Sequence, residues 1–391
     1  MIDLVVCGGG VIGLSIAYEA AKRCGWKVVV VEATQVGLAA SWAGAGILPP
    51  GATVSPLDPI DQLRAASHAM FPQWVENLQS DSQVDVGFIR CGGIYLARTI
   101  GELATLTANE VWWLDQGIAF ERWNREQLHS HSPALACDSV KRAWYLPQEC
   151  QIRNPRYLQA LVLSCKSLGV EIREYEELRT IRPRSSLVGQ DTCTVVTSSG
   201  EIQSRRACVT TGAWTRRVLQ EFMPAMQSTD IFPMRGQMVM FQLPDRPCVP
   251  VINDGHRYLV PRADGLILAG SCEEEAGFDN STTVEMIDEL KAWATDLMPC
   301  LAGATVAKTW AGLRPASVDG FPYLGPVPNF NNVFVAAGHY RHGIHFSPIT
   351  AKLMVENMTG SKTSIRMEPF QIGRGQTYSL ESMKYIENRE T

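Results

Sequence analysis

The sequence has none of the features that mark a membrane-spanning, nucleic-acid-binding or zinc-binding protein. It contains no uninterrupted run of about 18 apolar residues, the length that a helix needs to cross a bilayer. Its formal net charge is only −5, which gives no reason to expect a nucleic acid or a membrane as a partner. Its eleven cysteines are scattered without a C-x-x-C pair, so we expect no metal site.

A secretory signal peptide is also not expected, because the first predicted strand begins at residue 3. An odd number of cysteines in a chain without an export signal predicts free thiols in a reducing compartment, and hence a cytoplasmic protein. No internal repeats or low-complexity segments are present. With 391 residues, 46% of them hydrophobic, the chain is long enough for two domains with their own cores.

The most informative segment lies at the start of the chain. The apolar run Leu4–Cys7 leads directly into a G-x-G-x-x-G motif, and a helical pattern over residues 11–24 and a second apolar run, Val28–Val31, follow. Glycines in this motif let the backbone approach a pyrophosphate, which the N-terminus of the next helix receives. Glu32 closes the second run, where it can accept a hydrogen bond from a ribose hydroxyl. The order predicts a domain that binds an adenine dinucleotide.

Residues 37–51 are crowded with small side chains. This composition is typical of a flexible linker, and it also suits a tight loop whose backbone contacts a ligand. Trp42, Ile47 and Leu48 are interleaved with the small residues, which favours the loop. A long flat cofactor needs backbone donors of this kind wherever side chains would collide with it.

Later in the chain the α/β pattern returns. A helix is expected after residue 153, with Asn154 as its N-cap, Pro155 as its first residue and Gly169 as its end. Strands are expected at residues 170–172, 192–197 and 207–210. Because these segments follow a different middle segment, we expect the nucleotide-binding domain to be discontinuous.

Residues 232–310 predict a second domain. Antiparallel strands are expected at residues 237–242, 257–261 and 266–269, the last two joined through a turn at 263–265. A strand at residues 332–336 and a helix from Ser347 to Met358 then close the fold. We therefore expect an α/β protein with a Rossmann-like dinucleotide-binding domain and an α+β substrate domain built on an antiparallel sheet. The expected boundaries are 1–88, 149–229 and 310–372 for the first domain, 89–148 and 230–309 for the second, and 373–391 for a polar tail.

Polar side chains mark a first candidate site on the predicted hairpin. His256 and Tyr258 are two residues apart, so they should project from the same face of a strand. Each also has an ordinary interpretation, a structural or solvated histidine and a half-buried strand tyrosine. The run Glu273–Glu275 is interpreted as a solvated turn without a catalytic role.

Two arginines are the other candidates. Arg314 lies between apolar neighbours and Pro315, which restricts its rotamers and favours ligand binding over the surface position of most arginines. Arg341 lies in the polar loop Gly338–Gly343, whose glycines let the backbone approach something flat. No Ser-His-Asp or Cys-His order indicates acyl transfer.

Several of these segments resemble motifs of the D-amino-acid oxidase family of FAD-dependent amine oxidoreductases, and they look most like those of the glycine oxidases of thiamine biosynthesis. The likeness extends from residue 3 to about 360. Besides the N-terminal glycines, it is carried by Pro233-Met234-Arg235-Gly236-Gln237, Tyr258-Leu259-Val260-Pro261-Arg262, Trp310-Ala311-Gly312-Leu313-Arg314-Pro315 and Ala337-Gly338-His339-Tyr340-Arg341.

The resemblance implies a carboxylate-binding substrate site. Arg314 would hold the carboxylate as a bidentate pair, for which a planar guanidinium is suited, and Tyr258 would add a hydrogen bond. Arg341 and His256 would line the pocket, and two further residues, Met234 and Gln237, would support it.

The resemblance also implies FAD, bound without a covalent link, as the dinucleotide. Ile47 would lie near the flavin ring, where glycine oxidases often carry methionine. The residues assigned to the cofactor are Gly8, Gly10, Val11, Ile12, Gly13, Glu32, Ala40, Ser41, Gly44, Ala45, Gly46, Ile47, Leu178, Thr211, Gly212, Trp214, Gly338, His339, Arg341, His342, Gly343 and Ile344.

The implied reaction is oxidative deamination of glycine or a small amine or D-amino acid. Flavin N5 would accept a hydride from the substrate, giving an imine, and oxygen would then be reduced to hydrogen peroxide. An FAD-dependent dehydrogenase that passes electrons to another acceptor is the alternative, and a non-catalytic flavoprotein subunit or an NAD-only dehydrogenase is less favoured. The sequence leaves open which amine is preferred and whether the chain forms a homo-oligomer.

Overall fold

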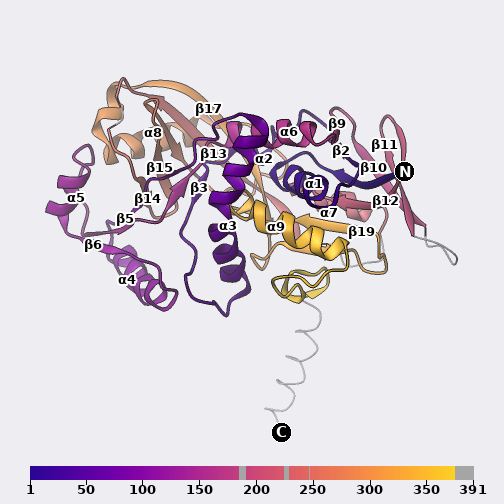
Figure 1. Cartoon of the computed structure of the whole chain (residues 1–391). Coiled ribbons are helices and arrows are strands. Elements are labelled where there is room, and N and C mark those ends of the chain that lie inside the picture. The colour runs from indigo at the N-terminus through magenta and orange to yellow at the C-terminus, as the bar shows by residue number, and fades with distance from the viewer. Residues whose placement is uncertain (185–190, 224–228, 246, 375–391) are drawn as a thin grey trace, which may run out of the picture. The chain divides into compact units, whose positions relative to one another are not determined.

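The computed structural model describes residues 1–184, 191–223, 229–245 and 247–374 (Figure 1). The chain divides into two compact units. Unit 1 contains Met1–Leu38, Leu161–Pro233 and the chain from Arg314 onwards, and unit 2 contains Ala39–Ala160 and Met234–Leu313.

These boundaries differ from the domains expected from the sequence, which placed residues 39–88 and 149–160 with the nucleotide-binding domain. In the structure β3 (Ile47–Leu48) and β4 (Ile89–Arg90) both pair with β8 (Cys150–Gln151) in unit 2. The indole Nε1 of Trp74 also donates a hydrogen bond to the hydroxyl of Tyr157, within the same unit. Of the expected tail, residues 375–391 lie outside the described part of the chain.

Unit 1 is built on an eight-stranded sheet. Its order is β10-β11-β12-β1-β2-β9, with β19 beside β12 and β18 beside β19. The five strands that pair in parallel are β1 (Ile2–Cys7), β2 (Val28–Val31), β9 (Glu171–Arg173), β12 (Gly200–Val209) and β19 (Val333–Ala337). Antiparallel pairing adds β10 (Leu178–Arg184), β11 (Thr192–Thr197) and β18 (Tyr323–Pro326). The expected Rossmann-like fold is confirmed.

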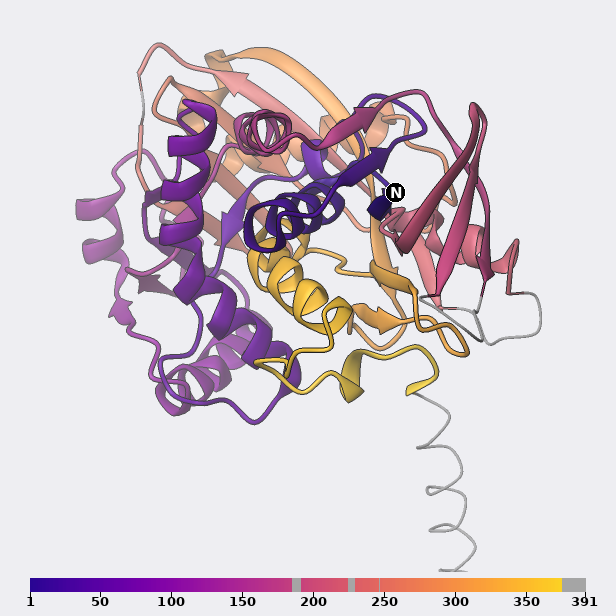
Figure 2. The same cartoon turned by 45° about the vertical axis from the view of Figure 1, so that its right-hand side comes forward.

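Two long helices of unit 1, α1 (Val11–Cys24) and α9 (Gly343–Met358), lie side by side (Figures 1 and 2). They run in the same direction, because Val11 approaches Gly343 at one end and Arg23 pairs with Glu356 at the other. The other helical segments described in this unit are α7 (Thr215–Gln220), η1 (Gly212–Trp214), η3 (Glu368–Phe370) and the second half of α6 (Asn154–Ser167).

Helix α9 begins four residues before the Ser347 expected from the sequence. Pro348 therefore lies inside the helix and cannot donate the usual hydrogen bond to the carbonyl of Ile344. The hydroxyl of Ser347 donates to that carbonyl instead, at 2.8 Å. Proline commonly marks the start of a helix, but here the hydroxyl of Ser347 replaces the backbone donor that Pro348 lacks.

Unit 2 contains a second eight-stranded sheet, of order β17-β13-β16-β15-β14-β5-β7-β6. Neighbours from β13 to β14 and from β5 to β6 pair antiparallel, as expected, whereas β14 and β5 pair in parallel. The strands are β5 (Gly93–Ala97), β6 (Glu121–Trp123), β7 (Arg142–Leu146), β13 (Ile231–Gln242), β14 (Val251–Asp254), β15 (Arg257–Pro261), β16 (Leu266–Gly270) and β17 (Thr305–Ser317).

Helix α8 (Val284–Leu297) of unit 2 packs against this sheet through an apolar face. It buries Ile287, Leu290, Ala294 and Leu297 in the same core as strands β15 and β16. Further helical segments described in this unit are α2 (Ala40–Ala43), α3 (Pro59–Ser82), α4 (Ile100–Asp115), α5 (Arg125–His131) and η2 (Pro299–Gly303).

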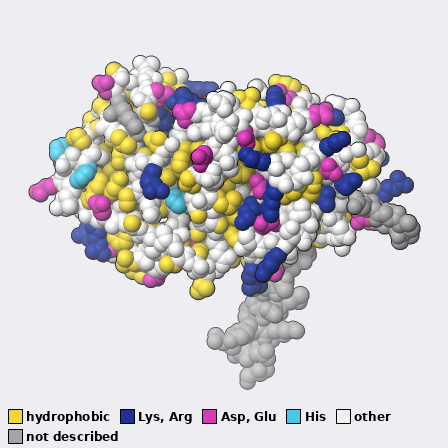
Figure 3. Space-filling view, in the orientation of Figure 1, with side chains coloured by type: hydrophobic (Ala, Val, Ile, Leu, Met, Phe, Trp, Pro, Cys, Tyr) yellow, Lys and Arg dark blue, Asp and Glu magenta, His cyan; other side chains and the backbone are white. Residues whose placement is uncertain are grey.

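The surface carries no large patch of one charge on the face drawn in Figure 3, where basic and acidic side chains alternate. Within the described residues, no helix is both long and apolar enough to span a bilayer. The eleven cysteines are free thiols, and only Cys300 among them is exposed.

Candidate functional site

The turn between β1 and α1 requires glycine at positions 8 and 13. A Cβ on Gly13 would lie 1.9 Å from the carbonyl oxygen of Gly8, and Gly8 itself has a φ of +118°. The hydroxyl of Thr210 donates to the carbonyls of Cys7 and Gly8, at 3.1 and 2.8 Å, and holds the turn from the end of β12. The bare backbone is therefore a cradle that a phosphate group can approach.

Glu32 lies beside this turn, at the end of β2. Its Oε2 accepts a hydrogen bond from the backbone N–H of Gly9 at 2.8 Å, and its Oε1 accepts two from Thr34 at 3.0 Å. A carboxylate has about four acceptor positions, so these three bonds fix the side chain and leave capacity on Oε2 for a ribose hydroxyl.

The segment before Leu178 lies against the same corner. The backbone N–H of Glu176 donates to the carbonyl of Glu32 at 2.8 Å, and Glu174 accepts from the N–H of Val36 at 2.8 Å. Leu178 follows at the start of β10. Three other residues assigned to the cofactor, Thr211, Gly212 and Trp214, lie directly after Thr210 in and beside η1.

The N-termini of two helices meet in unit 1. The first residues of α1 and α9 are neighbours, since a Cβ on Gly343 would lie 3.9 Å from a methyl carbon of Val11. Neither helix has an acidic residue in its first turn. Both N-termini carry partial positive charge from the helix dipole, so together they suit a ligand with negative charge at two places.

The loop before α9 is hydrogen-bonded to β17, the strand that carries Arg314. The backbone N–H of Tyr340 donates to the carbonyl of Pro315 at 2.9 Å, and Tyr340 has a φ of +48°. The guanidinium of Arg341 lies 5.5 Å from the ring centre of Tyr340, and Arg341 is exposed. The structure thus brings the predicted loop alongside Arg314.

Two histidines of this loop, His339 and His342, contact helix α9. His339 is buried, and its Nε2 lies 3.0 Å from the hydroxyl of Thr350 in α9. Burial, with a smaller contribution from His342, lowers the pKa of His339 to about 3, so this ring is neutral at physiological pH. The ring of His342 stacks on Phe346, with 4.9 Å between centres.

The segment rich in small residues (residues 37–51), here called the small-residue loop, lies mostly in unit 2 and is not a flexible linker. Its carbonyls accept hydrogen bonds from Asn154, Arg262 and Trp310. Asn154 therefore does not act as the expected N-cap of α6; the N–H of Tyr157 donates to Arg153, which places Asn154 inside the helix. The carbonyl of Gly46 in the same loop accepts a further hydrogen bond, from the backbone N–H of Ile152.

Two predicted site residues of unit 2, Ile47 and Tyr258, share one apolar cluster with Trp310. Ile47, Tyr258 and Trp310 are partly buried against a core that includes Met238. The hydroxyl of Tyr258 lies 3.4 Å from the sulfur of Met238, to which it donates.

His256 is not on the strand that carries Tyr258. It is exposed in a two-residue turn with Gly255, between β14 and β15, and β15 begins at Arg257. Gly255 has a φ of +61°, typical of a hairpin turn with glycine in its first central position. The spacing argument that put the two side chains on one face is therefore wrong.

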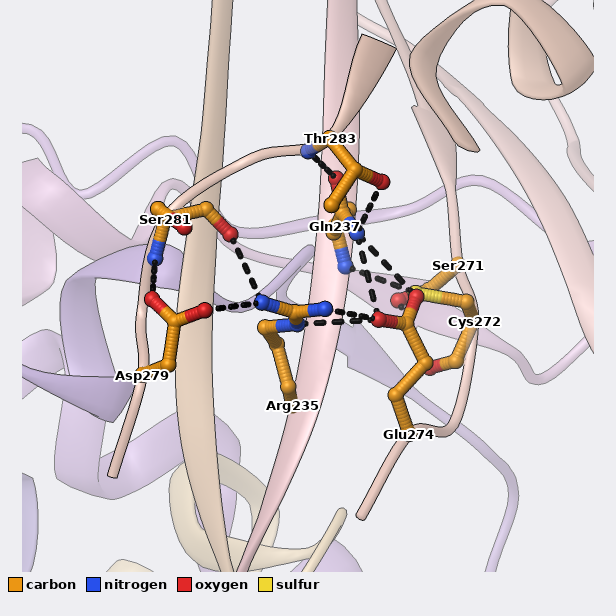
Figure 4. Close-up of polar contacts among 8 residues, drawn as sticks. All are labelled: Arg235, Gln237, Ser271, Cys272, Glu274, Asp279, Ser281 and Thr283. Carbon is orange, nitrogen blue, oxygen red and sulfur yellow. Dashed lines mark hydrogen bonds and ion pairs between the residues drawn. The ribbon is translucent and has the colours of Figure 1, made fainter. Parts of the chain in front are cut away.

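The interpretation of Glu273–Glu275 as a solvated turn is wrong for Glu274. Figure 4 shows Glu274 facing Arg235, whose Nε and Nη2 donate to one carboxylate oxygen at 2.9 and 2.5 Å. Gln237 donates to the same carboxylate at 3.1 Å, and Asp279 accepts from Arg235 at 2.8 Å. Burial opposes ionisation, but hydrogen bonds from Cys272 and Arg235 outweigh it and lower the pKa of Glu274. The network ties residues 271–283 to β13.

A buried acid in unit 2 was not recognised from the sequence. Glu149 is fully buried, accepts from the hydroxyl of Tyr95 at 2.6 Å and from the amide of Asn253 at 3.2 Å, and burial raises its pKa to about 7. Nothing local distinguishes this glutamate, because both partners are distant in sequence. Among the described residues no group of acidic, histidine or cysteine side chains is arranged to hold a metal ion.

Comparison with known proteins places these features in a family. The family model described as FAD dependent oxidoreductase matches residues 3–357. Glycine oxidase from Pseudomonas putida is 32% identical, over 94% of this chain and 97% of its own, and glycine oxidase from Geobacillus kaustophilus is 30% identical, over 95% and 97%. The crystal structure of the Geobacillus kaustophilus glycine oxidase superposes with a TM-score of 0.89, covering 95% of this chain and 98% of its own.

Proposed function

This chain belongs to the family of FAD dependent oxidoreductases, and from that premise we propose that it oxidises glycine or another small amine or D-amino acid. The observation that carries the proposal is the nearly full-length similarity to glycine oxidases, together with the position of Arg314 beside the loop that precedes α9. When bound, FAD supplies the acceptor for the two electrons that leave the substrate.

The residues of unit 1 fit this cofactor. The glycine turn and the N-terminus of α1 would hold its pyrophosphate, and Glu32 would bind its ribose. The N-terminus of α9 would stabilise negative charge on the flavin edge.

Substrate binding would depend on a charged pair. The guanidinium of Arg314 would hold the carboxylate bidentately, and the hydroxyl of Tyr258 would exchange its weak contact with Met238 sulfur for a hydrogen bond to the carboxylate. Arg341, exposed in its loop, would line the same pocket. Holding the α-carbon in one orientation is the main contribution required of the protein, because the cofactor carries the difficult step.

The proposed products are an imine, which hydrolyses in water, and hydrogen peroxide from oxygen. The purified FAD-loaded protein is assayed for peroxide with glycine, sarcosine, D-alanine, D-phenylalanine and L-alanine. We expect turnover of the small substrates glycine, sarcosine and D-alanine, because β-branched Ile47 would make the pocket less adaptable than the methionine that glycine oxidases often carry near the flavin ring. Reduction of an added electron-accepting dye without formation of peroxide would instead indicate a dehydrogenase. A preference for D-phenylalanine over glycine would contradict the proposed small substrate.

A further inference from the structure

Five backbone carbonyls within the small-residue loop accept hydrogen bonds from outside the loop. The donors are side chains at three positions and one backbone N–H, all within unit 2. The pairs are Asn154 Nδ2 to Ser41 at 3.0 Å and to Gly44 at 2.8 Å, Trp310 Nε1 to Ala43 at 2.9 Å, Arg262 Nη2 to Ala45 at 2.7 Å, and Ile152 N to Gly46 at 2.8 Å.

These donors are themselves held in place. Asn154 is 1% exposed, and both amide hydrogens are committed to the loop, while its buried Oδ1 accepts no hydrogen bond from the described residues. Arg262 is 5% exposed and also donates to Gln151 at 2.6 Å. The side chain of Gln151 in turn donates to the carbonyl of Pro261 at 3.1 Å. If the loop carbonyls moved away, these buried donors would be left without hydrogen bonds, at a cost in free energy. The donors therefore hold the loop in one conformation.

The direction of the carbonyls fixes the direction of the N–H groups. In a planar trans peptide the C=O of one residue and the N–H of the next point in opposite directions. Because the carbonyls of residues 43–45 point toward Trp310, Asn154 and Arg262, the N–H groups of Gly44, Ala45 and Gly46 point away from those side chains.

We propose that Asn154, Arg262 and Trp310 are positioning residues that aim the N–H groups of residues 44–46 at the oxygen and nitrogen acceptors of the flavin ring. The inference rests on the proposed contact between this loop and FAD. In this proposal the three side chains act on the flavin through the peptides of the loop. The bond from a guanidinium to the carbonyl of Ala45 also polarises the peptide whose N–H belongs to Gly46, which strengthens that N–H as a donor.

The sharpest test is Trp310→Phe, which keeps an aromatic ring beside Trp42 and removes the donor to Ala43 together with part of the indole volume. Trp293→Phe is the matched control, because its Nε1 donates to Asp254 elsewhere in unit 2, at 2.8 Å. Apoprotein of each variant is titrated with FAD, and the dissociation constant, the flavin midpoint potential and the apoprotein melting temperature are measured. We expect Trp310→Phe to weaken FAD binding about 3- to 10-fold and to alter the visible flavin spectrum, while Trp293→Phe leaves both unchanged.

Arg262 gives a second, electrostatic readout. Arg262→Met removes the charge and the donors and should lower the flavin midpoint potential, whereas Arg262→Lys keeps the charge and should restore part of it. Unchanged FAD affinity and potential in Trp310→Phe and Arg262→Met would overturn the inference, as would equal losses in Trp293→Phe. These measurements need no substrate, so a protein that oxidises no amine would contradict the proposed function and leave this inference standing.

Discussion

Arg314 is the residue on which the proposed substrate specificity depends most directly. Arg314→Ala should lower kcat/KM about 100-fold or more, because a substrate carboxylate in the site would lose its charge-assisted partner. Tyr258→Phe should cost less, about 1–2 kcal/mol, since Arg314 remains. Steady-state kinetics with glycine measure both, and the FAD content serves as the control for folding. Near-normal kcat/KM in Arg314→Ala would refute the carboxylate assignment.

Glu149 predicts a pH dependence of stability. Burial raises the pKa of this carboxyl from 4.5 to about 7, so between these values the folded chain retains a proton that the unfolded chain has lost. Stability should therefore fall as pH rises through this window, by an amount on the order of 3 kcal/mol once the carboxyl is ionised.

Glu149→Gln is the variant that checks this dependence, because the amide has the same size and no charge. Its melting temperature should vary less than that of the unmodified chain between pH 5 and about 7.5, and it should be the higher of the two above that range. Parallel pH profiles for the two proteins would show that Glu149 is not the group responsible.

Secondary-structure elements were predictable from the sequence where apolar periodicity was uninterrupted. The helix at residues 11–24 and the strands at 28–31, 192–197 and 257–261 have the expected bounds. Strand β13 begins at Ile231, six residues before the expected start, because Arg235 interrupts its apolar pattern and its charge is satisfied only by distant acids.

The candidate site was predictable where chemistry depends on local spacing, and less so where it depends on tertiary contacts. The glycine turn needs only the residues of one motif. By contrast, Glu274 and Glu149 acquire their roles from partners far away in the chain, and His256 was misplaced because its turn was not recognised. No local pattern distinguishes a solvated acid from one that a folded chain surrounds.

Helix α9 provides a test at the level of one element. Ser347→Ala should destabilise the protein by about 1 kcal/mol, because the carbonyl of Ile344 loses its donor. Pro348→Ala restores a backbone N–H at the position that normally serves this carbonyl. The loss of stability caused by Ser347→Ala should therefore be smaller when it is introduced into Pro348→Ala than when it is introduced into the unmodified chain. Urea denaturation of the four proteins measures this, and strictly additive effects would contradict the replacement of one donor by the other.

At the scale of the whole molecule, we predict that FAD is bound without a covalent link. Related sarcosine oxidases attach flavin through a cysteine shortly after the position of Arg314, and residues 315–330 contain no cysteine. Acid precipitation should therefore leave the yellow colour in the supernatant. Colour that remains with the pellet would contradict the prediction.

The chain passes between its two units four times, and three of these crossings lie inside continuous elements. The crossings are within α6, β13 and β17. Neither unit is therefore encoded by a single stretch of the gene. A recombination event that exchanged unit 2 alone would need two separate inserted segments, with three of the four junctions inside a helix or a strand. Substrate preference in this architecture is therefore expected to change by point substitution within a fixed framework rather than by exchange of a whole module.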